Sequence, residues 1–311
     1  MQMWKLAQPL LNMHQREKVV FIMGATGTGK SRLSIDLATS FSAEIINSDK
    51  IQIHKGLNIV TNKVTKEEQC GIPHHLLGIV DQNVDYTAKD FCLMATHAVE
   101  SILLKDKLPI IVGGSNTYIE ALVSDPEYGF KSKYDCCFLW VDVCPSVLHS
   151  FVSYRVDKMV ELGLVDEVRE AFDPHNTDYT TGIRRAIGVP ELDTYFRIEH
   201  CVDESGRADQ LRRAVNDIKE NTCILANKQL EKIKRLKHVK GWNINRVDAT
   251  EVFKMRNKEA ADDAWMKTVT HPSLKLVTRF LNDNTNDLES KFSTKVVTQS
   301  MIGKNHMIAT T

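Results

Sequence analysis

Short apolar runs and longer amphipathic stretches alternate along the first half of the chain. Four apolar runs predict buried strands, at Lys18–Met23, Glu44–Asn47, Leu108–Val112 and Cys137–Val143. Lys30–Phe41 follows the first run with the spacing of a helix, because its apolar residues recur three and four positions apart. Strands that are separated by helical stretches predict a parallel sheet covered by helices on both faces.

The second half of the chain is mainly helical. The pattern predicts helix from Pro145 to about Phe172, a loop over Asp173–Gly182, and a long basic helix over Asp209–Leu236 with an apolar stripe. Trp242–Val247 is expected as a further strand, and Pro272–Leu281 as a last short helix. The sheet is therefore expected to gain a further strand after the helical region.

Composition narrows the classes of protein that this sequence can encode. The 311 residues carry a formal net charge of +0, so no overall field attracts a nucleic acid. No apolar run reaches the length of about 18 residues that predicts a membrane span. The seven cysteines are odd in number and form no C-x-x-C pair, which argues against a disulfide framework or a zinc site. We expect reduced, buried thiols.

A glycine-rich motif lies between the first predicted strand and the first predicted helix. Its sequence GATGTGKS fits G-x-x-x-x-G-K-[ST] in the strand–loop–helix context that this motif requires. The glycines let backbone N–H groups face a phosphate, and the helix N-terminus adds partial positive charge. The lysine supplies a point charge and the serine hydroxyl can bind Mg²⁺. A di- or triphosphate site is predicted at Gly24, Ala25, Thr26, Gly27, Thr28, Gly29, Lys30 and Ser31.

One acidic residue, Asp49, follows the second predicted strand. Parallel strands place their carboxyl ends along one edge of a sheet, so Asp49 is expected to face the bound phosphates across a gap for a second substrate. There it could accept a proton from the acceptor. The alternative is that Asp49 caps the following turn. An ATPase would also need an acid that closes a strand beside the metal, and Asp142 is the candidate.

Five sequence blocks, taken in order, resemble one enzyme family. They are GATGTGKSRL, AEIINSDKIQIHKGLNIVTNK, GIPHHLLG, PIIVGGSNTYIEAL and GIRRAIGVPELD. Over residues 19–280 the chain closely resembles the plant adenylate isopentenyltransferases, which make cytokinins and are relatives of the tRNA dimethylallyltransferases. The resemblance implies transfer of a dimethylallyl group from dimethylallyl diphosphate to N6 of the adenine of ATP, ADP or AMP.

The resemblance also implies how the glycine-rich phosphate site at residues 24–31, the phosphate cradle, is used. It would hold the diphosphate of the prenyl donor rather than the phosphates of the nucleotide, and Mg²⁺ and Lys30 would stabilise the leaving diphosphate. Asp49 would accept the proton of the adenine amine. Thr26 would touch both the amine and the diphosphate.

Further residues match motifs of the family. Thr222 corresponds to a threonine that contacts the diphosphate, and Arg155 to an arginine near the substrate tunnel. The family commonly has Glu where this chain has Tyr154, and Arg where it has Lys228, which cannot form a bidentate fork.

Other residues have a binding and a structural interpretation. Arg184 and Arg185 are candidates for the nucleotide phosphates, with a solvated basic surface as the alternative. Ser115 and Tyr118 are expected to line the tunnel, unless they serve helix packing. The adjacent His74 and His75 have no Cys or acidic partner at the spacing of a zinc site, so a structural or substrate-adjacent role is expected.

The resulting prediction is an α/β fold with a P-loop NTPase-like parallel sheet flanked by helices, and an added smaller helical subdomain. Residues 1–17 form an N-terminal extension and residues 18–144 the P-loop core. Residues 145–282 form a mainly helical region that completes the core and covers the substrate tunnel, and residues 283–311 a disordered tail.

Three other functions remain open: a tRNA dimethylallyltransferase, a P-loop small-molecule kinase and a non-catalytic nucleotide-binding scaffold. A tRNA enzyme should show a broad basic surface and a channel for a flipped base. We expect nucleotide and prenyl diphosphate as partners, without nucleic acid or membrane, and leave the oligomeric state open. The resemblance implies plastid or cytoplasm as the compartment. The first fifteen residues lack acids but contain no Arg, so they leave targeting open.

Overall fold

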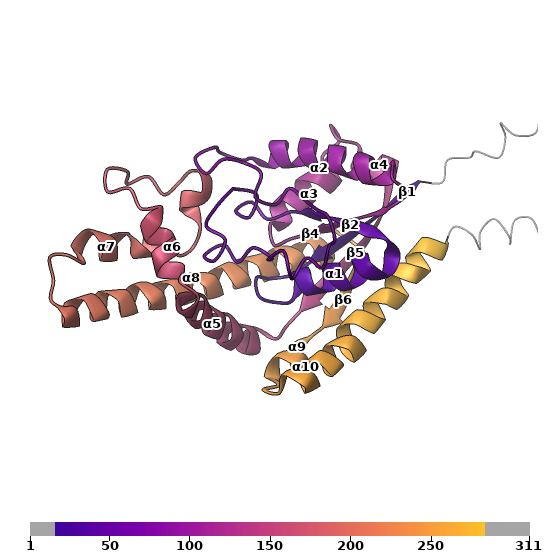
Figure 1. Ribbon diagram of the computed structural model, residues 1–311. Coiled ribbons are helices and arrows are strands. Elements are labelled where there is room, and N and C mark those ends of the chain that lie inside the picture. The colour runs from indigo at the N-terminus through magenta and orange to yellow at the C-terminus, as the bar shows by residue number, and fades with distance from the viewer. Residues whose placement is uncertain (1–15, 284–311) are drawn as a thin grey trace, which may run out of the picture.

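A six-stranded parallel sheet forms the centre of the computed structural model, which describes residues 16–283 (Figure 1). The strand order is β3-β2-β4-β1-β5-β6. The strands are β1 (Glu17–Met23), β2 (Ala43–Asn47), β3 (His74–His75), β4 (Leu108–Val112), β5 (Tyr134–Asp142) and β6 (Ile244–Asp248). The five predicted strands are therefore confirmed, whereas β3 was missed. The α/β class with a parallel sheet is confirmed as well.

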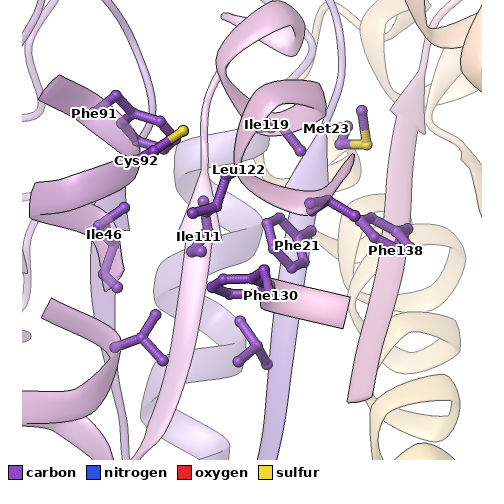
Figure 2. Packing of buried hydrophobic residues seen from close by; sticks show 14 of the residues in the cluster. Phe21, Met23, Ile46, Phe91, Cys92, Ile111, Ile119, Leu122, Phe130 and Phe138 are labelled. Carbon is purple, nitrogen blue, oxygen red and sulfur yellow. The ribbon is translucent and has the colours of Figure 1, made fainter. Parts of the chain in front are cut away.

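Alternating residues of each strand enter two different cores. Phe21 and Met23 of β1 point to one face, and Val20 and Ile22 to the other, all fully buried. Figure 2 shows Phe21 between Phe130 and Phe138, whose ring centroid lies 4.8 Å from that of Phe21 in a stacked arrangement. Both faces are apolar because helices cover both, as the continuous apolar runs of the strands predict.

Two sets of helices cover the sheet. The face that holds Phe21 packs against α2 (Ala88–Leu103), α3 (Asn116–Ser124), α4 (Phe130–Lys133) and the end of α8 (Glu204–His238). The opposite face packs against α1 (Lys30–Phe41), the first half of α5 (Pro145–Glu161), α9 (Thr250–Lys254) and α10 (Lys258–Trp265). The predicted long basic helix is confirmed but starts earlier than expected, because the Asp203 side chain caps it by accepting from Gly206 N at 2.8 Å.

A third, smaller core holds the helical part that projects from the sheet (Figure 1). It joins the second half of α5 with α6 (Leu164–Glu170), α7 (Pro190–Ile198) and the first half of α8, through residues such as Leu164, Leu192 and Ile218. The 3₁₀ turn Gly182–Arg185 lies between α6 and α7. The added helical subdomain is thus confirmed, while the predicted residue boundaries stay predictions.

The chain ends its described part in one long helical segment. It consists of α10, a π-helical turn over Met266–Thr270, and helix over residues 271–283. The predicted helix Pro272–Leu281 is the last part of this segment. Residues 1–15 and 284–311, on which the predicted N-terminal extension and disordered tail fall, lie outside the described residues.

The structure tests two expectations from composition, one about buried thiols and one about a membrane span. All seven cysteines are free, but Cys70, Cys144 and Cys201 are exposed, so the expectation that all the thiols are buried was wrong. All three lie in connections between helices and strands rather than inside one. Between residues 16 and 283, no helix combines the length and the apolar character that crossing a bilayer requires.

Candidate active site

Three loops meet at the carboxyl edge of the sheet and enclose a cavity of about 1260 Å³. They follow β1, β2 and β4, which are neighbours in the order β2-β4-β1. The cavity wall includes Thr26 and Lys30 after β1, Asp49 after β2, and Gly113 and Gly114 after β4. The sequence prediction that Asp49 lies across a gap from the phosphate loop is therefore consistent with the topology.

The loop after β1 has the geometry of a phosphate cradle. Gly27 and Gly29 have φ values of 84° and 86°, in the left-handed region that glycine adopts without strain. The buried Thr28 side chain closes the loop by donating to Ala25 O at 3.0 Å. Ser31 is exposed at the start of α1 and lines the cavity. The predicted cradle residues thus lie together, with Thr28 turned inward to the loop backbone.

Two cations lie beside the cradle without a carboxylate partner among residues 16–283. Lys30 Nζ donates to Ala25 O at 2.6 Å, and burial lowers the pKa of Lys30 to about 8, although the charge of Asp49 raises it. Arg155 on α5 donates to Thr26 Oγ1 at 2.9 Å, and burial lowers the pKa of Arg155 to about 10. Its Nε is buried and makes no hydrogen bond within the described chain. Two uncompensated charges form a site for an anion.

Asp49 combines the two roles that the sequence left open. Its Oδ1 accepts from Ile51 N at 2.9 Å and from Gln52 N at 3.3 Å, so one oxygen caps the turn after β2. Among residues 16–283, no hydrogen bond is found at Oδ2. Asn47 fixes the loop further, because its Oδ1 accepts from Asp49 N. Asp49 is half-buried and lines the cavity, so a held carboxylate presents one free oxygen there.

Gln229 is a site residue that the sequence analysis missed. Its Oε1 accepts from Thr26 N at 2.7 Å, and its Nε2 donates to Gly114 O at 3.0 Å. One side chain on α8 therefore links the loops after β1 and β4. In the sequence Gln229 is one polar residue among Asn, Lys and Glu on the long basic helix, and only its tertiary contacts distinguish it.

The apolar wall of the cavity was also missed. It is formed by Phe151 and Tyr154 on α5, Phe253 and Met255 at the end of α9, and Trp265 on α10. The rings of Phe151 and Phe253 meet edge to face at 4.7 Å. Tyr154, noted in the sequence as a departure from the family pattern, lies one residue before Arg155 and shares this wall.

Thr222 is not brought to the cavity wall. It is buried in α8, where its hydroxyl donates to Ile218 O at 2.7 Å, one turn back along the helix. Lys228 is exposed on the same helix and does not line the cavity either. The diphosphate contact predicted for Thr222 stays a prediction, and in this conformation its hydroxyl proton is used within the helix.

Arg184 and Arg185 also lie away from the cavity wall. Arg184 donates to the carbonyls of Asp178 and Asn176, both at 2.8 Å, and its guanidinium lies over Tyr179, so it shapes the loop before it. Arg185 pairs with Asp85 at 3.1 Å. Its charge, after burial, helps to lower the pKa of Lys50, which places Arg185 on the Asp49 side of the site.

Ser115 and Tyr118 support the site from behind. Ser115 Oγ accepts from Lys50 N at 3.0 Å and so fastens the Asp49 loop to the start of α3. The Tyr118 hydroxyl donates to Tyr86 O at 2.6 Å, and its ring stacks on Phe91. Neither residue lines the cavity, so the packing interpretation accounts for their contacts.

The two histidines and Asp142 have structural partners. His75 Nε2 lies 2.7 Å from Glu44 Oε2, and His74 Nδ1 lies 2.8 Å from Ile72 O. Asp142 accepts from Arg246 Nε at 2.6 Å and does not line the cavity. Within residues 16–283, no cluster of three His, Cys, Asp or Glu side chains could hold a metal.

Comparison with known sequences gives a consistent result. The model of the IPP transferase family matches residues 52–130 and 124–236. Adenylate isopentenyltransferase 3, chloroplastic, of Arabidopsis thaliana is 60% identical over 86% of this chain and 80% of its own length. Adenylate isopentenyltransferase 7, mitochondrial, of the same plant is 54% identical over 88% and 83%. The adenylate isopentenyltransferase of Humulus lupulus is 47% identical over 84% and 90%.

Solved structures share the fold. A eukaryotic dimethylallyltransferase acting on tRNA has a TM-score of 0.70 and 25% identity, over 86% of this chain and 80% of that one. A tRNA isopentenylpyrophosphate transferase from Bacillus halodurans has a TM-score of 0.64 and 23% identity, over 85% and 100%. Sequence and fold agree, and the chain belongs to the IPP transferase family, among the prenyl-transferring adenylate isopentenyltransferases.

Proposed function

We propose that this protein transfers the dimethylallyl group of dimethylallyl diphosphate to N6 of the adenine of ATP or ADP, and of AMP less readily. The observation that carries the proposal is the pair of uncompensated cations, Lys30 and Arg155, that faces the Asp49 carboxylate across one cavity. An anionic leaving group fits beside the two cations, and a group that must lose a proton fits beside the Asp49 carboxylate.

The donor diphosphate binds in the cradle. Lys30 and Arg155 neutralise the charge that develops as the C1–O bond breaks and the diphosphate leaves with the bonding electron pair. The Thr26 hydroxyl accepts from Arg155, so its own proton is free to donate to a diphosphate oxygen. The prenyl chain lies in the cavity, where the surrounding side chains hold it in line with the acceptor.

Asp49 acts on the acceptor. As the N6–C1 bond forms, the amine must lose a proton, and Asp49 Oδ2 accepts it while Oδ1 stays bonded to the backbone N–H groups of Ile51 and Gln52. Those two bonds fix the carboxylate, so it needs no reorientation during the reaction. The product is an N6-prenylated adenine nucleotide, the class of compound to which isoprenoid cytokinins belong.

Ser31 and the donor diphosphate form a fitting site for Mg²⁺. Mg²⁺ takes oxygen ligands and keeps several waters, and is commonly held by few protein groups together with substrate phosphates. The exposed Ser31 hydroxyl lies at the cavity wall beside the cradle. When bound, the ion would supply further charge stabilisation to the diphosphate.

A tRNA acceptor is the second candidate, because a solved relative with 25% identity acts on tRNA. The close relatives of 54–61% identity carry the name of adenylate enzymes and support a free nucleotide as the acceptor. The formal net charge of +0 supports the same choice, since tRNA binding depends on neutralising many phosphates.

A plastid location is proposed for the protein, since the relatives of 60% and 61% identity are named chloroplastic. A mitochondrial relative shows that organelles other than the plastid are an outcome to test. Expression of the full chain with a C-terminal fluorescent tag in plant cells should show signal in plastids. Signal confined to the cytoplasm or to mitochondria would contradict the plastid assignment.

The acceptor is tested by a product assay. Purified protein is incubated with dimethylallyl diphosphate, Mg²⁺ and, in separate reactions, ATP, ADP, AMP or unmodified tRNA, and products are analysed by mass. We expect one added prenyl group on ATP and ADP, a smaller yield on AMP and none on tRNA. Prenylation of tRNA alone would replace the proposed acceptor, and phosphoryl transfer without prenyl donor would indicate a kinase.

A further inference from the structure

The C-terminal helical segment runs alongside α1, the helix that follows the phosphate cradle (Figure 1). Gly29, Arg32 and Asp36 are three and then four positions apart, so they share one face of the start of α1. The contacts below place this face against α10 and the π-helical turn. This segment lies beyond residue 236, where the match to the IPP transferase family model ends.

Trp265 is the centre of this contact. Its side chain is buried, with 2% of its surface exposed, and its ring covers Gly29 so closely that a Cβ at Gly29 would lie 2.5 Å from Trp265 Cη2. The indole Nε1 donates to Asp36 Oδ2 at 2.8 Å. The guanidinium of Arg32 lies 4.9 Å from the ring centroid. The same tryptophan therefore touches the cradle and two side chains of α1.

A π-helical turn provides a second bond to the same carboxylate. Thr270 Oγ1 donates to Asp36 Oδ2 at 2.7 Å. In a regular α-helix, positions five apart lie about 140° apart around the axis, and Trp265 and Thr270 would face different ways. The wider turn over Met266–Thr270 brings both donors to Asp36. Arg32 and Asp262 add an ion pair at 2.8 Å across the same interface.

We propose that Trp265, held by Asp36 and Thr270, is a positioning residue for the donor half of the site. Gly29 precedes Lys30, and the backbone N–H groups of this turn are those that a diphosphate would meet. A ring packed against Gly29 restricts the left-handed turn and so fixes where those groups and the Lys30 side chain point. Trp265 acts on the donor through Gly29, with its remaining surface in the cavity wall.

We predict that substitutions at Trp265 or Thr270 weaken binding of the prenyl donor more than binding of the nucleotide. This prediction rests on the proposed function. Trp265→Ala removes the ring, Trp265→Phe keeps an aromatic wall without the indole N–H, and Thr270→Val removes the second bond while keeping the shape of the side chain. We expect the KM for dimethylallyl diphosphate to rise about tenfold in Trp265→Ala and two- to threefold in the other two variants. The KM for the nucleotide should change less than twofold.

Inorganic pyrophosphate gives a test that is independent of turnover. Its binding to the wild-type protein should change tryptophan fluorescence, and the change should be largely lost in Trp265→Phe, although Trp4, Trp140 and Trp242 remain. Calorimetric titration should show weaker pyrophosphate binding by Trp265→Ala, Trp265→Phe and Thr270→Val, in that order. Circular dichroism and the midpoint of thermal unfolding verify the fold, and the milder variants decide if Trp265→Ala does not fold.

Equal changes in both KM values, or unchanged pyrophosphate binding in folded variants, would overturn the positioning role. Failure of the proposed function is distinguishable, since it would appear as wild-type protein that prenylates no adenine nucleotide. The pyrophosphate titration would still report whether Trp265 shapes the cradle.

Discussion

The two ends of β2 carry charged groups in opposite situations. Near its start, the buried Glu44 carboxylate contacts His75, Lys105 and Lys107, all within 3.0 Å, and those hydrogen bonds lower the pKa of Glu44 to about 2 despite its burial. Just beyond its end, Asp49 faces Lys30 and Arg155, and neither cation has a carboxylate partner within residues 16–283. The cluster around Glu44 is saturated with partners, whereas the charges around Asp49 are arranged for groups that the protein itself lacks.

This difference separates charges that stabilise a fold from charges that bind and react. A buried ion that is fully paired within the protein offers nothing to a ligand, and removing one partner destabilises the fold. Desolvated cations without a carboxylate partner cost stability, and this cost is offset when an anion binds. Matched substitutions at the two ends of the strand test whether the charges differ in this way.

The largest effect is expected from Asp49→Asn. The amide can still accept from Ile51 N and Gln52 N through its oxygen, but it cannot accept the amine proton. We expect kcat to fall on the order of 10²- to 10⁴-fold, the range for a missing general base, with an unchanged unfolding midpoint. Steady-state kinetics with saturating donor and nucleotide measure the fall in kcat. A fall in kcat of less than about tenfold, which corresponds to about 1.4 kcal/mol, would contradict the role of Asp49 as the proton acceptor.

The second effect concerns the cation of the cradle. Lys30→Met keeps an unbranched side chain, one atom shorter, and removes its charge. We expect kcat/KM for the donor to fall about 10- to 100-fold, since a charged hydrogen bond is worth about 1.5–3 kcal/mol. Lys105→Met is the matched control, because Lys105 contacts Glu44 at the other end of β2. Unchanged donor kinetics in Lys30→Met would contradict the placing of the diphosphate in the cradle.

The third effect is a pH dependence that follows from the pKa of Lys30. Burial lowers that pKa to about 8, and the diphosphate binds the protonated form. Donor affinity is therefore present below about pH 8 and lost as the pH rises, so the donor KM should increase about tenfold for each pH unit above 8. Donor KM values from pH 6.5 to 9.5 show this, with a flat profile in Lys30→Met. A flat wild-type profile would contradict the role of the ammonium group.

The smallest effect on catalysis is expected from Glu44→Gln. This variant should lose on the order of 3 kcal/mol of stability in urea unfolding, because Lys105 and Lys107 lose their buried counter-ion. Its kcat and both KM values should stay within twofold of wild type. The pKa of Glu44 is lowered from 4.5 to about 2, so its contribution is present above pH 4.5 and is lost as the pH falls towards 2. A catalytic defect in the folded variant would break the comparison.

Much of the fold and the centre of the site could be predicted from the sequence. The apolar runs that became β1, β2, β4 and β5 are local signals, and the cradle motif fixes its own geometry through Gly27 and Gly29. Asp49 could be placed because the parallel topology determines where the end of β2 lies. These inferences depend on residues near one another in the chain, or on one rule of sheet topology.

The rest depends on contacts between distant parts of the chain. β3 is two residues long and carries no alternation, so pairing with Ile45 and Ile46 alone defines it. Gln229 is hydrogen-bonded to Thr26, 203 positions away in the chain, and Trp265 to Asp36, 229 positions away. A glutamine or a tryptophan on a helix does not by itself predict such a contact. Arg184 was one of two candidates for the nucleotide phosphates, and only the structure shows that it donates to backbone carbonyls of its own loop.

In the proposed reaction the cradle binds the leaving diphosphate while Asp49 faces the adenine amine. A crystal structure with a non-reactive thiolo-diphosphate analogue of the donor, together with ATP, tests it most directly. We expect the diphosphate within hydrogen-bonding distance of Lys30 and Arg155, and adenine N6 within reach of Asp49 Oδ2. A structure with the nucleotide's own phosphates in the cradle, and Asp49 turned from the ring, would contradict it.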